Sequence, residues 1–109
     1  MGRKEEFMVE CRKGTDALYF NFSGEIDESC ANRVRAYMDE MLEKFPSKRV
    51  VMDMKDLKFM DSTGIGILLG RYKKIANNNS IAYILNPSSG IDRLLTLSGI
   101  YQLMPKVEK

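Results

Sequence analysis

Apolar and polar positions along the chain predict a series of strands and helices. Residues 7–11 and 17–22 alternate apolar with polar side chains, as half-buried strands do, and residues 13–16 between them favour a turn. We therefore expect an antiparallel hairpin at the start of the chain. Residues 50–52, Val-Val-Met, lack this alternation and predict a central parallel strand buried on both faces.

Residues 29–45 have the spacing of an amphipathic helix that covers the sheet, and Pro46 should end it. The side chains expected to face the sheet are Val34, Tyr37, Met38, Met41, Leu42 and Phe45. Residues 81–85 predict a further short buried strand, which completes a βαβ unit with the central strand and the helix between them.

The C-terminal part predicts one more helix and one more strand. Ser89 and Asp92 form a capping-box-like start, and Gly99 fits the end of this helix. Its inward residues should be Ile91, Leu94, Leu95 and Leu97. Residues 101–104 predict a final short strand, and residues 105–109 predict a frayed tail.

The helix between the two central strands has unusual glycines. A connector with Lys55, Asp56 and Lys58 should lead to Asp61, and Ser62 is the expected N-cap. A helical wheel turns Ile65, Leu68, Leu69, Tyr72, Ile75 and Ala76 toward the sheet, and Gly66, Ile67, Gly70 and Lys74 away from it. A glycine within a helix costs about 1 kcal/mol relative to alanine. The outward glycines therefore suggest close approach by another protein.

The start of this helix also has an unusual charge pattern. No acidic residue follows Ser62 before Asn77, although acidic residues are common in a first helical turn. The free N–H groups and the positive end of the helix dipole remain available to an anion. The Ser62 hydroxyl is thus a candidate phosphate carrier, and the alternative is that Ser62 only caps the helix.

Residues 56–73, which read DLKFMDSTGIGILLGRYK, closely resemble the signature of the anti-sigma factor antagonists of the STAS domain family. The resemblance is greatest to the sporulation branch. Residues 23–27 resemble, in addition, the Gly-Glu-Leu-Asp segment that follows the second strand of these proteins. From the residues alone, this segment predicts a turn glycine and Asp27 as a helix N-cap. In the family, this loop lies beside the phosphorylated serine.

The resemblance implies a switch between partners. Ser62 would be phosphorylated by a protein that is both anti-sigma factor and serine kinase. The unphosphorylated form would bind that protein and release its sigma factor, and a serine/threonine phosphatase would restore it. The resemblance and the outward-facing glycines together predict the residues that contact a partner. These are Asp27, Asp61, Ser62, Thr63, Gly64, Gly66, Ile67 and Gly70. A STAS module of a general stress-response or other partner-switching system is the alternative.

Composition agrees with a single domain over residues 1–109, with 44% hydrophobic and 29% charged residues. A net charge of +2 gives no sign of nucleic-acid binding, and the sequence shows no signal-peptide core or membrane-length apolar stretch. We therefore expect a cytoplasmic protein whose partners are proteins or nucleotides. Cys11 and Cys30 have no metal or redox spacing and should be reduced packing residues.

Two enzymatic alternatives compete with a binding module that has no cofactor. Gly64, Gly66 and Gly70 match a variant of the dinucleotide fingerprint, but Asp61-Ser62 separates them from the strand and Asn86 stands where a ribose-binding carboxylate is needed. A Ser62 nucleophile would need a base, and the chain has no histidine. The prediction is one α/β domain that is not an enzyme, with a mostly parallel sheet, an antiparallel N-terminal strand and flanking helices.

Overall fold

The computed structural model of the protein describes residues 6–107. The strands are β1 Met8–Lys13, β2 Ala17–Ile26, β3 Arg49–Met60, β4 Ile81–Leu85 and β5 Lys106–Val107. The α-helices are α1 Ala31–Lys44, α2 Ser62–Asn77 and α3 Ser89–Ser98, and the 3-10 turns are η1 Glu28–Cys30 and η2 Ile100–Gln102.

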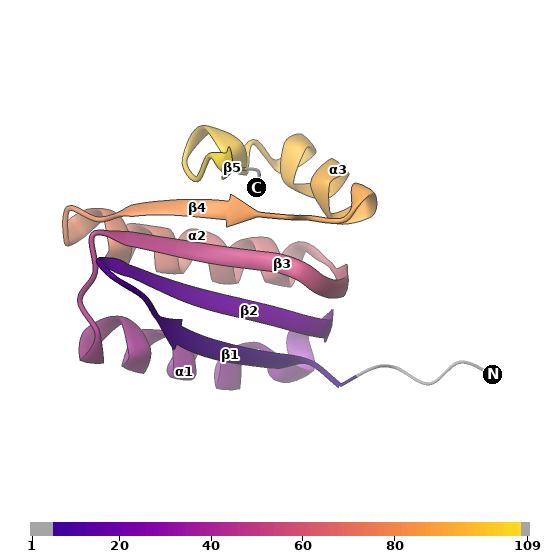
Figure 1. The fold of residues 1–109 in the computed structure, drawn as a ribbon. Helices are drawn as coiled ribbons and strands as arrows, with labels where there is room; N and C mark the ends of the chain where they lie inside the picture. Colours follow the sequence, from indigo (N-terminus) through magenta and orange to yellow (C-terminus); the bar gives the residue numbers. More distant parts are fainter. Residues whose placement is uncertain (1–5, 108–109) are drawn as a thin grey trace.

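The five strands form one sheet in the order β1-β2-β3-β4-β5. β1 pairs with β2 in antiparallel fashion, and the remaining pairs are parallel. Helices α1 and α2 lie behind the same face of the sheet, and α3 lies beyond β4 (Figure 1). The predicted α/β class, the parallel sheet and the N-terminal hairpin at its edge are confirmed.

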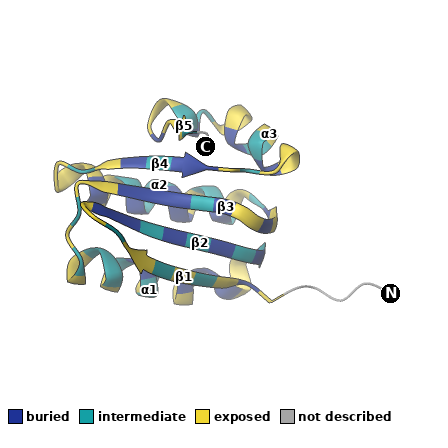
Figure 2. Ribbon diagram, in the orientation of Figure 1, coloured by how far each residue is buried: buried dark blue, intermediate teal, exposed yellow. Residues whose placement is uncertain are grey.

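The core lies between the sheet and the two helices behind it. In β2 the alternating residues Leu18, Phe20 and Phe22 are at most 2% exposed, and they contribute to one cluster with Val34 and Met38 of α1. Figure 2 shows this buried band along the middle strands, with exposed residues at the loops and on the outer helix faces. The predicted inward face of α1 is confirmed, since its other members Tyr37, Met41, Leu42 and Phe45 pack on the same cluster.

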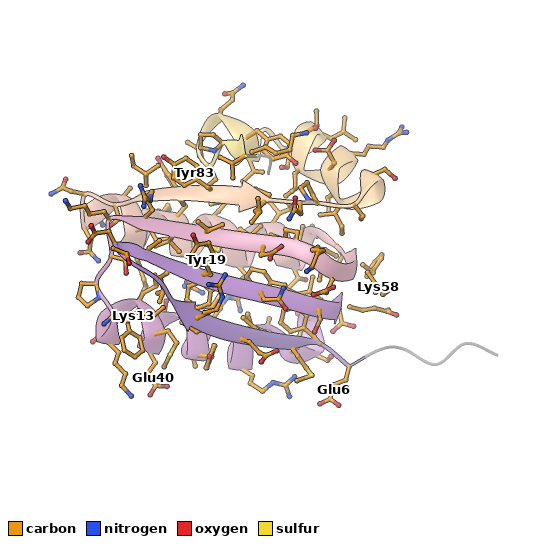
Figure 3. The ribbon with its side chains drawn as sticks, in the orientation of Figure 1. Glu6, Lys13, Tyr19, Glu40, Lys58 and Tyr83 are labelled. Carbon is orange, nitrogen blue, oxygen red and sulfur yellow. The ribbon has the colours of Figure 1, made fainter. Side chains whose placement is uncertain are left out.

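The opposite face of the sheet carries a mixture of polar and aromatic side chains. Tyr19 of β2 and Tyr83 of β4 lie on this face (Figure 3), each half-buried. The Arg12 guanidinium lies 4.3 Å from the centre of the Tyr19 ring, which is a cation–π contact.

The central strand is longer than its sequence suggested. Residues 53–60, expected as a connector, continue β3 because β2 runs on to Ile26 and supplies pairing partners as far as Ile26↔Met60. Two register shifts interrupt this pairing, and they break the alternation that would have marked the extension as a strand. Gly24 lies at one shift, with φ +82°, where a Cβ would lie 2.1 Å from the Glu6 carbonyl oxygen.

The C-terminal predictions need three corrections. Ser88, and not Ser89, is the N-cap of α3, and its hydroxyl accepts a hydrogen bond from the Ile91 N–H at 3.4 Å. Leu97 is not inward but 76% exposed. Residues 101–104 form no strand because left-handed Gly99, the predicted helix end, turns the chain directly into η2, and the strand follows at residues 106–107.

In the described part of the chain, no helix combines the length and the apolar character needed to cross a membrane. Cys11 and Cys30 are both free thiols, and Cys30 is buried in the core as predicted for a packing residue. Burial raises the pKa of the half-buried Cys11 thiol above its ordinary value.

Candidate functional site

The ends of two neighbouring strands bring the predicted site residues together. β2 and β3 are parallel and adjacent, and their last residues, Ile26 and Met60, are paired. Asp27 and Asp61 are the next residues of the two strands. The loops after β2 and β3 therefore lie side by side at the carboxyl edge of the sheet, which is where ligands and partners meet such sheets.

Asp61 caps α2, so the prediction that Ser62 is the N-cap is wrong. Its extended backbone, with φ −106° and ψ −167°, lets the carboxylate accept a hydrogen bond from the Thr63 N–H at 2.9 Å. Ser62 is consequently the first residue of the helix and is exposed. Its hydroxyl makes no hydrogen bond with any other described residue, so it is free to react.

Asp27 plays the same part in the neighbouring loop, as predicted for a cap. Its carboxylate accepts hydrogen bonds from the Ser29 N–H at 2.9 Å and from the Ser29 hydroxyl at 2.6 Å, which caps η1. Two capped turns, one after each strand, thus hold Asp27 and Asp61 at adjacent places on the surface.

Gly64 is a glycine because the core leaves no room for a side chain. A Cβ there would lie 2.1 Å from Met60 Cγ and 3.2 Å from Ile26 Cγ2. The start of α2 therefore packs directly on the last residues of β2 and β3, which fixes Ser62 relative to the sheet. The sequence alone did not show this contact, because the side chain that requires the glycine comes from the preceding strand.

The predicted outward face of α2 is partly wrong. Gly66 is exposed, and a Cβ at Gly66 or Gly70 would meet nothing within 4 Å, so these glycines do face open space. Ile67, however, is 0% exposed and belongs to the core, and it cannot be a surface contact for a partner. Ala76, expected inward, is exposed.

The buried face of α2 differs from the predicted one because α2 packs against α1 as well as against the sheet. Arg71, a polar residue, is only 7% exposed, and its Nε lies 2.9 Å from the Asp39 carboxylate of α1. Lys74 approaches the same carboxylate at 3.3 Å. The buried stripe of α2 is thus centred between the sheet-facing and α1-facing sides.

A hollow of about 380 Å³ opens beside the Ser62 hydroxyl. It lies between the start of α1 and the start of α2, and it is lined by Glu28, Ala31, Asn32, Arg35, Ser62, Thr63 and Gly66. Arg35 and Asn32 were not among the predicted site residues. Their helical register is visible in the sequence, but their position next to Ser62 depends on how the two helices lie together.

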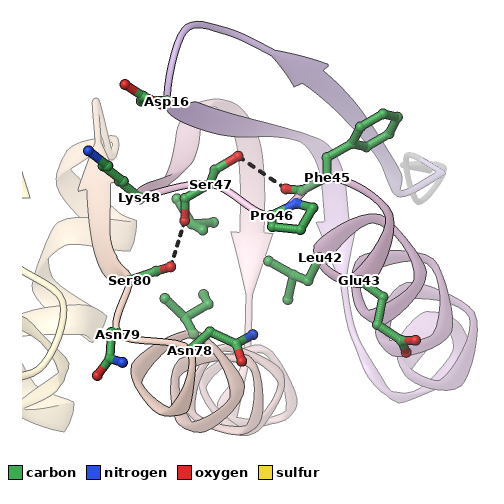
Figure 4. Close-up of a pocket in the computed structure, with 12 residues that line it drawn as sticks. Asp16, Leu42, Glu43, Phe45, Pro46, Ser47, Lys48, Asn78, Asn79 and Ser80 are labelled. Carbon is green, nitrogen blue, oxygen red and sulfur yellow. Dashed lines mark hydrogen bonds between the residues drawn. The ribbon is translucent and has the colours of Figure 1, made fainter.

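A larger hollow, of about 680 Å³, lies at the opposite edge of the sheet (Figure 4). Asp16, Lys48 and Ser80, which directly precede three parallel strands, lie around it, and the Ser80 hydroxyl donates a hydrogen bond to the Ser47 carbonyl at 2.5 Å. None of the predicted site residues lines it. Among the described residues, no group of three or more cysteine, aspartate or glutamate side chains could hold a metal ion.

Known proteins share both the sequence pattern and this fold. Residues 6–109 match the STAS domain family. The anti-sigma F factor antagonist of Paenibacillus polymyxa is 34% identical over 97 residues, covering 89% of this chain and 83% of that protein. The anti-sigma-B factor antagonist of Bacillus subtilis (strain 168) is 26% identical over 96 residues, covering 88% and 86%.

Solved structures show the same architecture. The anti-sigma factor antagonist SpoIIAA in its unphosphorylated form superposes with a TM-score of 0.77 at 24% identity, covering 94% of this chain and 88% of that one. Its phosphorylated form gives a TM-score of 0.70 at 24% identity, with coverages of 94% and 91%. The sequence match over nearly the whole length and the shared fold lead to one conclusion: the chain belongs to the STAS domain family.

Proposed function

We propose that this protein is an anti-sigma factor antagonist switched off by phosphorylation of Ser62. The observation that carries the proposal is the position of Ser62, an exposed hydroxyl that starts α2 beside the Asp27 loop. The unphosphorylated protein binds an anti-sigma factor that is also a serine kinase, and the bound sigma factor is released. A serine/threonine phosphatase reverses the modification. The protein acts in the cytoplasm without a cofactor or enzymatic activity of its own.

Two comparisons support this proposal. The relative from Paenibacillus polymyxa, similar over most of both chains, is named as an anti-sigma F factor antagonist. SpoIIAA, which shares the fold, has been solved in an unphosphorylated and a phosphorylated form. Phosphorylation is therefore known for a protein of the same fold.

The electrostatics of the site explain how a phosphate would act on partner binding. Phosphoserine carries a charge of about −1.5 to −2 at neutral pH. At position 62 it lies next to Asp61, in a surface that a partner must dehydrate when it binds. An uncompensated charge buried in an interface costs several kcal/mol. The fold itself should hardly change, since effects at an exposed helix end are worth about 0.3–1 kcal/mol.

The glycines on α2 define the second part of the proposed partner surface. A Cβ at Gly66 or Gly70 would meet nothing within 4 Å, and Gly66 lines the hollow together with Ser62 and Thr63. A partner backbone can approach this face closely. With Ile67 buried, the contact set that we propose is Asp27, Asp61, Ser62, Thr63, Gly66 and Gly70, and Gly64 supports it from below.

Incubation with the anti-sigma factor kinase of the same organism and ATP tests the proposal. We expect one phosphate per chain, mapped to Ser62 by peptide mass spectrometry, and none on Ser62→Ala. The unmodified protein should release the sigma factor from the kinase in a competition assay, and Gly66→Gln should do so less well. A phosphate on Thr63 or Ser89, or no release of the sigma factor, would refute the assignment.

The general stress-response system is the second candidate for the circuit. The Bacillus subtilis relative is named for a different sigma factor, as an anti-sigma-B factor antagonist, and at 26% identity it supports a circuit other than the sigma F one. The same competition assay separates the two circuits if both kinds of anti-sigma factor are offered. The first candidate predicts preference for the sporulation-type partner.

A further inference from the structure

Among the described residues that line the hollow beside Ser62, one is basic, Arg35 of α1. Arg35 lies just over one turn from the start of α1, on the side of that helix that faces the start of α2, and it is half-buried. Two other arginines of α1 and α2 do not line this hollow. Arg33 on the same helix points to a different hollow, and Arg71 is committed to Asp39.

The Arg35 guanidinium has spare hydrogen-bonding capacity. Its Nη1 donates to the Asn32 Oδ1 at 3.3 Å, which is long for an N–H···O hydrogen bond. It forms no salt bridge with any described residue. A guanidinium has five N–H donors arranged as a planar fork, so several remain unpaired here. Such a fork matches the geometry of a phosphate, which it can bind through two parallel hydrogen bonds.

We propose that Arg35, with Asn32 beside it, forms an intramolecular binding site for the phosphate carried by Ser62. The inference rests on the proposed function, since that function supplies the phosphate. The ligand is the phosphoserine dianion on α2, and the recognising groups are the guanidinium fork and the side-chain amide on α1. The phosphate would thus link the start of α1 to the start of α2.

Charges around the hollow show why such a site is needed. Glu28 lines the same hollow, and Asp61 immediately precedes the acceptor, so two carboxylates oppose a phosphate at this position. The N–H groups at the start of α2 offset part of this repulsion. Arg35 supplies a full positive charge that no other described residue lining the hollow carries, and it holds the phosphate in its doubly ionised form.

The ionisation of the phosphoserine measures this contact directly. We would incorporate phosphoserine at position 62 during translation, so that no kinase is needed, and titrate its second ionisation by ³¹P NMR. The ordinary value of this pKa is about 6. In Arg35→Gln it should rise by about half a unit or more relative to the otherwise unchanged protein, because a nearby opposite charge is lost. Arg35→Lys, which keeps the positive charge, should leave the phosphoserine pKa close to that of the parent protein.

Arg33→Gln is the matched control, since it removes the same charge from an exposed position of the same helix. It should leave the pKa unchanged within error, and circular dichroism should show both variants folded. An equal pKa in the Arg35→Gln and parent proteins, or an equal shift in both variants, would overturn the proposal. Because the phosphate is installed without the kinase, failure of the kinase to modify Ser62 would refute the proposed function and leave this measurement valid.

Discussion

Gly64 and Gly66 are close neighbours on α2, but they are glycine for different reasons. Gly64 is buried against Met60, where a side chain has no room, whereas Gly66 faces open space. A helix gains about 1 kcal/mol when glycine is replaced by alanine. Only at Gly64 does packing oppose this gain, so the two positions separate a structural role from a role in partner access.

The pair Gly64→Ala and Gly66→Ala tests this difference. Overpacking typically costs about 1–3 kcal/mol, so after the gain in helix propensity Gly64→Ala should lose on the order of 1 kcal/mol of stability. Gly66→Ala should keep or gain stability, and Gly70→Ala should behave in the same way. Urea unfolding of the three variants measures this, and a Gly64→Ala protein as stable as Gly66→Ala would show that Met60 repacks without cost.

The sequence predicted the turn between β3 and α2, but not which of its residues caps the helix. Asp61 and Ser62 are both good N-caps, and the choice depends on which residue keeps an extended backbone at the end of β3. The same ambiguity explains why the N-cap of α3 is Ser88 and not Ser89. Helix boundaries one residue apart are not resolved by side-chain preference when neighbours share it.

At the scale of elements, the orientation of α2 depends on its packing against α1, which the helical-wheel prediction did not include. The wheel assumed that only the sheet covers α2, but α1 covers it too, and Arg71 makes the contact with Asp39. Arg71, which the wheel assigned to neither face, is buried by this contact, and Ile67, expected to face outward, belongs to the core. The amphipathic pattern of α1, with a wider polar face, was predicted correctly.

Asp39→Ala should weaken the contact between α1 and α2. It leaves the Arg71 guanidinium buried without its carboxylate partner, and an unpaired buried donor costs about 1–3 kcal/mol. Lys74→Ala removes an ion pair to the same carboxylate from a side chain that is 52% exposed, so it should cost less than about 1 kcal/mol. Chemical unfolding compares the two, and equal losses would contradict a special role for the buried pair.

The C-terminal elements are held together by Asp92 of α3. It accepts hydrogen bonds from the Tyr101 hydroxyl at 2.5 Å and from the Lys106 ammonium at 3.0 Å. The hydrogen bond from Tyr101, followed by that from Lys106, lowers the pKa of Asp92 below its ordinary value. Burial, followed by the hydrogen bond to Asp92, raises the pKa of Tyr101.

A lowered carboxylate pKa gives stability that is present above the unfolded-state pKa and is lost as pH falls through the folded-state value. The contribution of Asp92 should therefore be complete at pH 6 and should fade below about pH 4. Asp92→Asn should destabilise the protein at pH 6, and the difference from the parent should shrink on acidification. Urea unfolding at several pH values measures it, and a difference independent of pH would contradict the assignment.

At the scale of the whole molecule, the order of strands and helices predicted the mostly parallel sheet and its antiparallel N-terminal strand, but not the place of the last strand. Parallel neighbours joined by helices determined the topology, and the resemblance at residues 56–73 located the candidate acceptor on it. The neighbourhood of Asp27 and Asp61 followed from the ends of two parallel strands. Arg35 did not follow, because its place beside Ser62 depends on the packing of α1 against α2, which is a long-range contact.

Direct titration of the anti-sigma factor kinase with this protein, with and without phosphate on Ser62, tests the central claim. Calorimetry should show binding by the unmodified protein and by Ser62→Ala, and at least about 100-fold weaker binding by the phosphoserine form, as a misplaced interface charge of several kcal/mol requires. Amide NMR shifts confined to residues near Ser62 would confirm that the modified protein stays folded. Equal affinity of the unmodified and phosphorylated forms would contradict the account.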